Sequence, residues 1–186
     1  MSSPVLLLPG WQNSGPLHWQ SLWEKAHGYL RVEQHEWQRP LRGDWIARLE
    51  EVLLSVASRA RPAVLAAHSL GCNTVAAWAA HSRNRHLVKG ALLAAPADVE
   101  RTDVREQLPA WGPISMQPLP FASLVLHSSS EPFCAQKRSL AIAQAWGARS
   151  VDCGACGHIN SESGLGDWPA GHAALLELID VPLAHR

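Results

Sequence analysis

An excess of charge of either sign is missing from this sequence. Its 186 residues carry 16 Lys and Arg against 16 Asp and Glu, a formal net charge of +0, and the basic residues form no run. Proteins that bind nucleic acid or a membrane surface through electrostatics need a basic patch or a basic amphipathic helix. We therefore expect no nucleic acid and no membrane among the partners of this chain.

Long hydrophobic runs are missing too. No stretch approaches the roughly 20 apolar residues that cross a bilayer. The run Val5-Leu6-Leu7-Leu8 near the N-terminus has no basic residue before it and is too short for the apolar core of a signal peptide. From these two features we expect a cytoplasmic protein.

Cysteine is scarce, with four residues at positions 72, 134, 153 and 156. A chain of this length with so few cysteines has no disulfide framework. The spacing of Cys153 and Cys156 is that of thioredoxin-type redox sites and of half a zinc site, but no second cysteine pair or nearby histidine pair completes four ligands. We interpret the cysteines as packed thiols, leave a minor redox role for this pair open, and expect no metal and no cofactor.

Apolar runs alternate with segments of helical periodicity along the whole chain. This alternation predicts one α/β domain over residues 1–186, with a mostly parallel sheet of about six strands and helices on both faces. Four prolines interrupt residues 97–120, so we expect an irregular loop there, long enough to overhang a site. The expected strands are 5–8, 31–37, 63–67, 87–95, 123–127 and 148–153, and the expected helices are about 17–27, 44–56, 70–80, 134–146 and 168–179.

The pentapeptide Ala67-His68-Ser69-Leu70-Gly71 lies between an apolar run and an Ala-rich helical segment. The order strand, sharp turn, helix is the context of a nucleophile elbow, which exposes a serine hydroxyl above a sheet and leaves room only for small neighbours. Ala67 stands where the pattern has glycine and adds only a methyl group. The alternative interpretation is a serine that merely caps the helix.

Reactive groups in a parallel sheet gather at the carboxyl ends of the strands. A serine nucleophile needs a base, a carboxylate that orients the base, and donors for the oxyanion. Each role has a candidate at a strand end, in the chain order of α/β-hydrolases: nucleophile, acid, histidine. The candidates are Ser69 as nucleophile, Glu131 or alternatively Asp98 as acid, His158 as base, and the backbone N–H groups of Leu70 and Trp11 as oxyanion hole, with Gly10 allowing the close turn.

Several segments together resemble the small serine hydrolases related to retinoblastoma-binding protein 9. The resemblance covers nearly the whole chain and implies a minimal α/β-hydrolase without a large cap domain, with Ser69 as nucleophile and His158 as base. The family usually has Asp where this chain has Glu131. The segments that carry it are Pro9-Gly10-Trp11 with His18-Trp19, the 67–71 elbow, Ser130-Glu131-Pro132-Phe133-Cys134, and the tail from Gly157-His158-Ile159-Asn160 to Gly164-Leu165-Gly166-Asp167-Trp168-Pro169.

Most of the nine tryptophans belong in the core on this interpretation. We expect two exceptions: Trp11, whose ring can stack on an acyl or alcohol group beside Gly10, and Trp111, which can line the site from the irregular loop. We expect His68 to point away from the chemistry and His18 to tie down the first loop through a hydrogen bond.

These residues predict an enzyme that hydrolyses a small carboxylic ester through an acyl-enzyme formed on Ser69. With only residues 97–120 as a lid, we expect a shallow site that favours short acyl groups. The alternative is a non-catalytic protein that keeps the fold and binds a protein partner, for which the departures at Ala67 and Glu131 are the only support. The sequence identifies neither the natural substrate, nor the oligomeric state, nor any protein partner.

Overall fold

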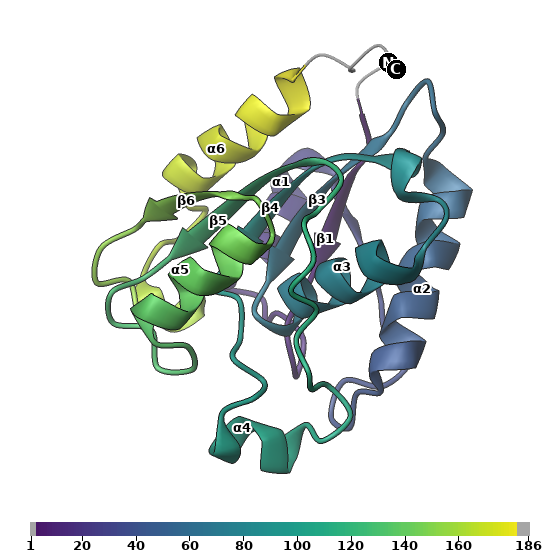
Figure 1. The fold of residues 1–186 in the computed structure, drawn as a ribbon. Coiled ribbons are helices and arrows are strands. Elements are labelled where there is room, and N and C mark those ends of the chain that lie inside the picture. The colour runs from purple at the N-terminus through teal and green to yellow at the C-terminus, as the bar shows by residue number, and fades with distance from the viewer. Residues whose placement is uncertain (1–2, 182–186) are drawn as a thin grey trace.

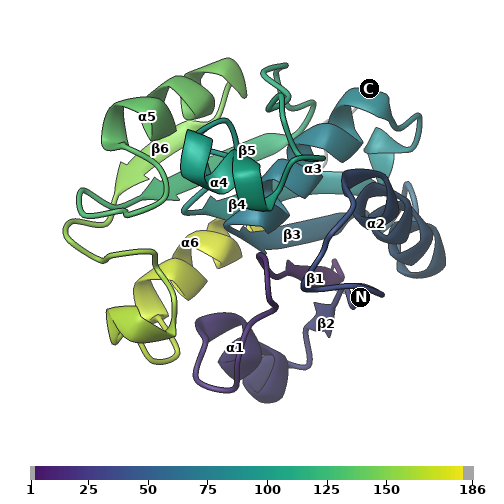
Figure 2. The ribbon, with the colours of Figure 1, turned by 90° about the horizontal axis from the view of Figure 1, so that it is seen from below.

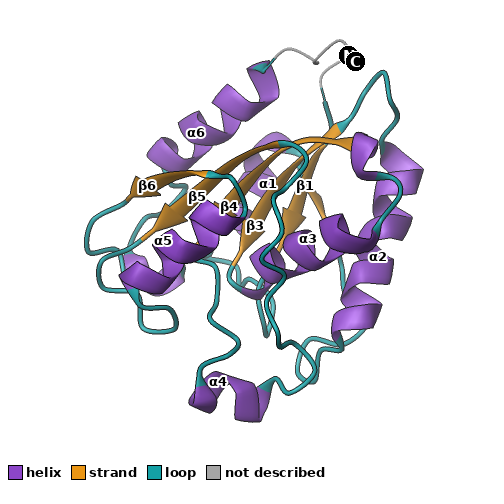
Figure 3. Cartoon of the chain, in the orientation of Figure 1, coloured by secondary structure: helices purple, strands orange, loops and turns teal. Residues whose placement is uncertain are grey.

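The computed structural model describes residues 3–181 and contains a six-stranded sheet (Figures 1 and 3). The strand order is β2-β1-β3-β4-β5-β6, and all five neighbouring pairs are parallel. The carboxyl ends of all strands therefore meet at one edge of the sheet. The strands are β1 (Val5–Leu8), β2 (Leu30–Arg31), β3 (Ala63–His68), β4 (Val88–Ala94), β5 (Ala122–His127) and β6 (Arg149–Asp152).

Helices cover both faces of the sheet. Figure 2 shows α1 and α6 on one face and α2, α3 and α5 on the other. Successive side chains of β1 point to opposite faces of the sheet. Val5 and Leu7 belong to the core beneath α1 and α6, and Leu6 and Leu8 belong to the core beneath α2, α3 and α5. Seven of the nine tryptophans are buried in these layers. The helices are α1 (Trp19–His27), α2 (Arg42–Val56), α3 (Leu70–His81), α4 (Thr102–Gln107), α5 (Gln136–Ala145) and α6 (Pro169–Asp180), with short 3-10 turns at Arg85–Leu87 and Ser161–Ser163.

The edge strand is shorter than its sequence pattern predicts. We expected a strand over 31–37, but β2 comprises only Leu30–Arg31. The chain then leaves the sheet, and Trp37 packs at a right angle on Trp45 of α2 while its carbonyl accepts the backbone N–H of Gln12. Packing of the Trp37 ring against α2 takes residues after Arg31 away from the sheet, so the strand ends early.

The connection between β4 and β5 is not wholly irregular, as we had expected for residues 97–120. It contains α4, which lies beyond the carboxyl ends of the strands (Figures 1 and 2). Val104 and Leu108, four residues apart, are both buried and fix this helix on the body of the protein. The absence of proline between Ala97 and Leu108 is the sequence signal for it.

The architecture confirms the expected parallel sheet with helices on both faces. The insertion between β4 and β5 carries only the six residues of α4, so no large cap domain covers the strand ends. Within residues 3–181, every helix falls short of the length and apolar character that a membrane span requires.

Candidate active site

Ser69 lies at the sharp turn between β3 and α3. Its backbone φ of 52° and ψ of −118° is a strained conformation for a residue with a side chain. The turn is held from both sides, since the Ser69 N–H donates to the Ala94 carbonyl at 2.9 Å and the end of β1 passes against Gly71. A Cβ on Gly71 would lie 2.3 Å from the Leu8 carbonyl oxygen. Small residues at this turn are therefore a steric requirement.

We predict that Gly71→Ala destabilises the protein by about 3 kcal/mol and lowers its Tm by roughly 6–12 °C, because the added methyl group meets backbone that cannot move aside. Circular dichroism melting measures the change. Gly43→Ala, in the first turn of α2 with nothing within 4 Å of the added Cβ, is the matched control and should not lower the Tm. Equal melting of the two variants would contradict the steric account of the elbow.

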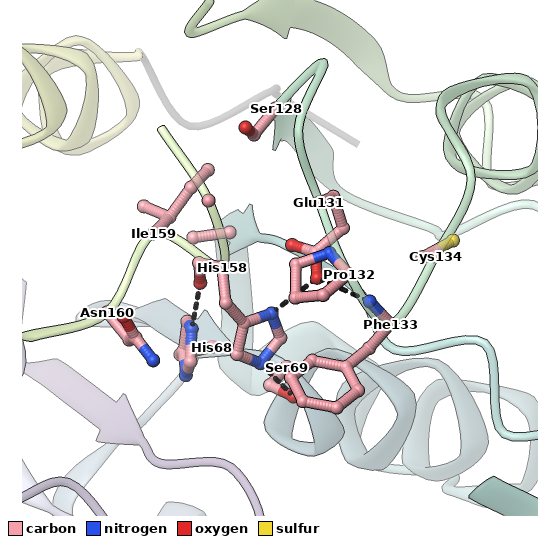
Figure 4. Close-up of polar contacts among 12 residues, drawn as sticks. His68, Ser69, Ser128, Glu131, Pro132, Phe133, Cys134, His158, Ile159 and Asn160 are labelled. Atoms are coloured by element: carbon pink, nitrogen blue, oxygen red, sulfur yellow. Dashed lines mark hydrogen bonds and ion pairs between the residues drawn. The ribbon is translucent and has the colours of Figure 1, made fainter. Parts of the chain in front are cut away.

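Three side chains from separate strand ends form one hydrogen-bonded line (Figure 4). His158 Nε2 lies 3.0 Å from Ser69 Oγ, and His158 Nδ1 lies 2.7 Å from Glu131 Oε1. An ionised carboxylate only accepts hydrogen bonds, so the His158 proton is on Nδ1 and Nε2 is free to accept the serine proton. The Glu131 side chain is 1% exposed, and the Phe133 N–H also donates to its Oε1 at 3.0 Å.

The loops that carry Glu131 and His158 are bound to each other. The hydroxyl of Ser128 accepts the Cys156 N–H and that of Ser130 accepts the Gly157 N–H, each at 2.9 Å. On the other side of the His158 loop, the Trp19 indole N–H donates to the Ile159 carbonyl at 2.9 Å. These contacts fix the position of the His158 ring relative to Ser69 and Glu131.

The rival acid, Asp98, is engaged elsewhere. Its Oδ1 lies 3.5 Å from Nε of Arg138 and accepts the Glu100 N–H at 3.3 Å. The structure therefore brings Glu131, and not Asp98, to the histidine.

Two backbone N–H groups beside the serine have no hydrogen-bond partner among residues 3–181. Leu70 is the first residue of α3, so its N–H has no partner within the helix, and the Trp11 N–H makes no hydrogen bond within the described part of the chain. Gly10 brings the Trp11 segment against the serine, since a Cβ on Gly10 would lie 2.8 Å from Ser69 Cβ. The N-terminal end of α3 adds a favourable field for a developing negative charge.

A cleft of about 510 Å³ opens over Ser69 and His158. An apolar part of its wall comes from Val104, Leu108 and Phe133. The polar Asp103 and Gln107 of α4, the first loop, including Trp11, and the loop after His158 also line it. The Phe133 ring packs on the His158 ring with centroids 4.7 Å apart. This contact holds the Phe133 ring against the His158 imidazole.

Trp111 does not line this cleft, contrary to our expectation. It is 1% exposed, its indole N–H donates to the Pro40 carbonyl at 2.9 Å, and its ring packs at a right angle on Trp45. The 97–120 segment folds back onto α2, and burial of the large ring there leaves α4 to form the wall of the cleft.

His68 also differs from the sequence expectation, because its ring faces the site. Its Nε2 donates to the His158 carbonyl at 2.8 Å, and the two rings pack edge to face. Burial, with the nearby His158 and His18, lowers the pKa of His68 well below its ordinary value. His68 is therefore neutral and positions the backbone of His158.

His18 does tie down the first loop as expected, since its Nδ1 accepts the Gln20 N–H and caps α1. Its ring is buried, and desolvation, reinforced by the charges of Arg31 and His158, lowers its pKa to about 3. Between pH 6.5 and 3 the unfolded chain binds a proton here that the folded chain does not. The free energy of unfolding therefore decreases as the pH falls through this window.

We predict that lowering the pH from 6.5 to 4.5 reduces the free energy of unfolding by about 2 kcal/mol because of His18 alone. Urea denaturation at these two pH values measures the loss. His18→Asn keeps an oxygen that can cap α1 but has no group that titrates, so it should lose about 2 kcal/mol less than the wild type. The same pH dependence in both proteins would show that His18 does not cause it.

The four cysteines are free thiols. Burial raises the pKa of Cys153 to about 11, and the Cys156 thiol donates to the Cys153 carbonyl at 2.8 Å. A thiol held in its protonated form is a poor nucleophile and a poor redox centre. The geometry favours the packed-thiol interpretation.

Sequence reasoning gave no role to several residues that border Ser69. Phe133 appeared only within a matched segment, and Val104 and Leu108 fell in a loop treated as irregular. Asn160 and Ser161 line the cleft next to His158. Position two residues after the candidate acid and the candidate base is the signal that could have found Phe133 and Asn160.

Comparison with known proteins bears on the family and the fold. The Serine hydrolase family matches residues 5–177. A YdeN-like hydrolase from Pectobacterium atrosepticum is 29% identical, with a TM-score of 0.84 over 97% of this chain and 92% of that one. The ydeN gene product of B. subtilis, 19% identical, has a TM-score of 0.78 over 95% and 98% of the two chains.

More distant structures share the fold alone. Est1E from Butyrivibrio proteoclasticus, solved with ferulic acid bound, is 11% identical with a TM-score of 0.69 over 95% of this chain and 87% of that one. No curated protein matches the sequence. Because the family match spans nearly the whole described chain, the protein belongs to the serine hydrolase family.

Proposed function

We propose that this hydrolase cleaves small, uncharged carboxylic esters through an acyl-enzyme on Ser69. The observation that carries the proposal is the line from Ser69 Oγ through His158 to Glu131, at 3.0 and 2.7 Å, beside two free backbone N–H groups in an open cleft. This arrangement supplies a nucleophile, a base, an orienting carboxylate and oxyanion donors in one place.

In the first half of the reaction, Ser69 Oγ attacks the ester carbonyl carbon while its proton passes to His158 Nε2. The carbonyl oxygen becomes an oxyanion that accepts hydrogen bonds from the N–H groups of Trp11 and Leu70. The imidazolium is stabilised by Glu131, and its Nε2 proton goes to the alkoxide as the bond to the leaving alcohol breaks. Water then attacks the acyl carbon and gives a proton to His158, which passes it to Ser69 Oγ as the acyl–oxygen bond breaks and the carboxylic acid leaves.

The cleft indicates the character of the ester. No Lys or Arg belongs to its lining within residues 3–181, so an anionic substrate would be desolvated without a counter-charge. The apolar wall of Val104, Leu108 and Phe133 suits a short hydrocarbon group, in keeping with the expected shallow site. The tail from Gly157 to Pro169 supports placing the chain, within the family, near the hydrolases related to retinoblastoma-binding protein 9.

Stopped-flow hydrolysis of p-nitrophenyl acetate and p-nitrophenyl butyrate tests this proposal. An acyl-enzyme mechanism with slow deacylation predicts a burst of p-nitrophenolate close to one equivalent of enzyme, followed by steady turnover. A folded protein that gives neither burst nor turnover above buffer with either ester would refute ester hydrolysis.

A further inference from the structure

Three of the residues that line the cleft are histidines whose rings pack one on the next. The ring of His158 packs on that of His68 with centroids 4.7 Å apart, and His68 packs on His18 at the same separation. His158 is bound to Ser69 and Glu131, and His68 to the His158 carbonyl. The proposed mechanism gives no task to His18, the third ring.

The proton of the His18 ring is on Nε2. Its Nδ1 accepts the Gln20 N–H at 3.2 Å and so carries no proton. With a pKa lowered to about 3 by burial, the ring is neutral at neutral pH. A neutral imidazole with a bare Nδ1 is a hydrogen-bond donor at Nε2.

This donor has no partner. The His18 side chain is buried, and its Nε2 finds no acceptor among residues 3–181. Buried donors are almost always paired, so an orphan donor on a residue that lines the cleft calls for an acceptor from outside the chain. Asn160, which also lines the cleft, offers a second donor: its Oδ1 accepts the Glu162 N–H, and its amide nitrogen points to the His68 side (Figure 4).

The chemistry of this part of the cleft selects the acceptor. Its donors are uncharged, and Arg31, whose charge acts on His18, is held by Glu24 and Asn13 and does not line the cleft. A carboxylate or phosphate would therefore lose its hydration without gaining a counter-charge. A keto or amide carbonyl oxygen accepts a hydrogen bond without that penalty.

We propose that His18 is a substrate-binding residue whose Nε2–H donates to a second carbonyl oxygen of an uncharged ester, distinct from the oxygen at the carbon that Ser69 attacks. The preferred substrates are then small esters that carry a keto or amide group in the acyl or the alcohol part. This inference rests on the proposed ester hydrolysis and adds a substrate class to it.

Two matched pairs of esters test the inference. The first pair is p-nitrophenyl pentanoate and p-nitrophenyl 4-oxopentanoate, measured by release of p-nitrophenolate. The second pair is pentyl acetate and 4-oxopentyl acetate, measured by release of acid. Each kcat/KM is divided by the hydroxide-catalysed rate constant of the same ester to remove intrinsic reactivity. In at least one pair the keto member should be favoured by about tenfold to a hundredfold in the wild type.

Substitution assigns that preference to His18. In His18→Asn, Oδ1 can still cap α1, but the amide ends short of the Nε2 position, so the keto preference should fall to near unity. His18→Ser, which also keeps a capping oxygen, is the second variant in case the first does not fold. Leu17→Ala, at an exposed neighbouring residue outside the cleft, is the control and should keep the full preference.

The outcomes separate this inference from the proposed function. A wild type that hydrolyses all four esters without keto preference overturns the role of His18 and leaves ester hydrolysis standing. Equal losses for both members of a pair in the His18 variants assign His18 to capping alone, which also overturns it. A wild type that hydrolyses none of the esters, and gives no burst with p-nitrophenyl acetate, overturns both.

Discussion

Ser69→Ala should abolish ester hydrolysis, with kcat for p-nitrophenyl butyrate falling on the order of 10⁶-fold. The substitution removes the only atom that forms the proposed bond to the acyl group. It leaves the elbow in place, because the Ser69 backbone N–H, which holds the turn to Ala94, is unchanged. The Tm should therefore stay close to that of the wild type.

The matched control is Ser129→Ala, which removes an exposed hydroxyl at the end of β5 outside the cleft. It should keep wild-type kcat. If Ser69→Ala retained turnover near the wild-type level while Ser129→Ala behaved normally, Ser69 would have no place in the mechanism.

Glu131→Gln should lower kcat about 10⁴-fold, the loss known for an Asp→Asn change in a serine triad. Gln has the same shape but no charge to stabilise the imidazolium, and its amide group can donate to Nδ1, which leaves the His158 proton on the wrong nitrogen. The Glu131 carboxylate is buried and bound to both His158 and the Phe133 N–H, so its replacement removes a buried counter-charge that lies next to the imidazole.

Asp98→Asn is the companion variant, since Asp98 was the other acid that the sequence allowed. It pairs with Arg138 in the structure, and its substitution should leave kcat near the wild-type value. If Asp98→Asn lost most of its kcat while Glu131→Gln kept it, Asp98 in the segment after β4 would be the acid, which would reverse the assignment.

The features that the sequence predicts well are those whose causes are local. The runs in β1 and β3 are buried on both faces, so they are continuously apolar and easy to recognise. The elbow is recognisable because Gly71 has no room for a side chain next to Leu8. Ser69, Glu131 and His158 lie close together because each follows a strand, and the strand ends share one edge of a parallel sheet.

The features that it does not predict depend on packing between distant segments. The hydrogen bond from His68 to the His158 carbonyl joins residues 90 positions apart, and no periodicity in either segment signals it. Trp111 is in the core because Pro40 and Trp45, some 70 residues earlier, provide an acceptor and a surface for its ring. Packing of Trp37 on Trp45 accounts for the short β2, and burial of Trp111 accounts for its absence from the cleft wall.

The central claim is that Ser69 is an activated nucleophile, and labelling with a fluorophosphonate followed by peptide mass spectrometry tests it most directly. The account predicts one covalent adduct, on the peptide that contains Ser69, formed rapidly in the wild type, slowly in Glu131→Gln and not at all in Ser69→Ala. A folded wild-type protein that stays unlabelled, as a pure binding protein would, or that carries its adduct on another residue, would contradict the account.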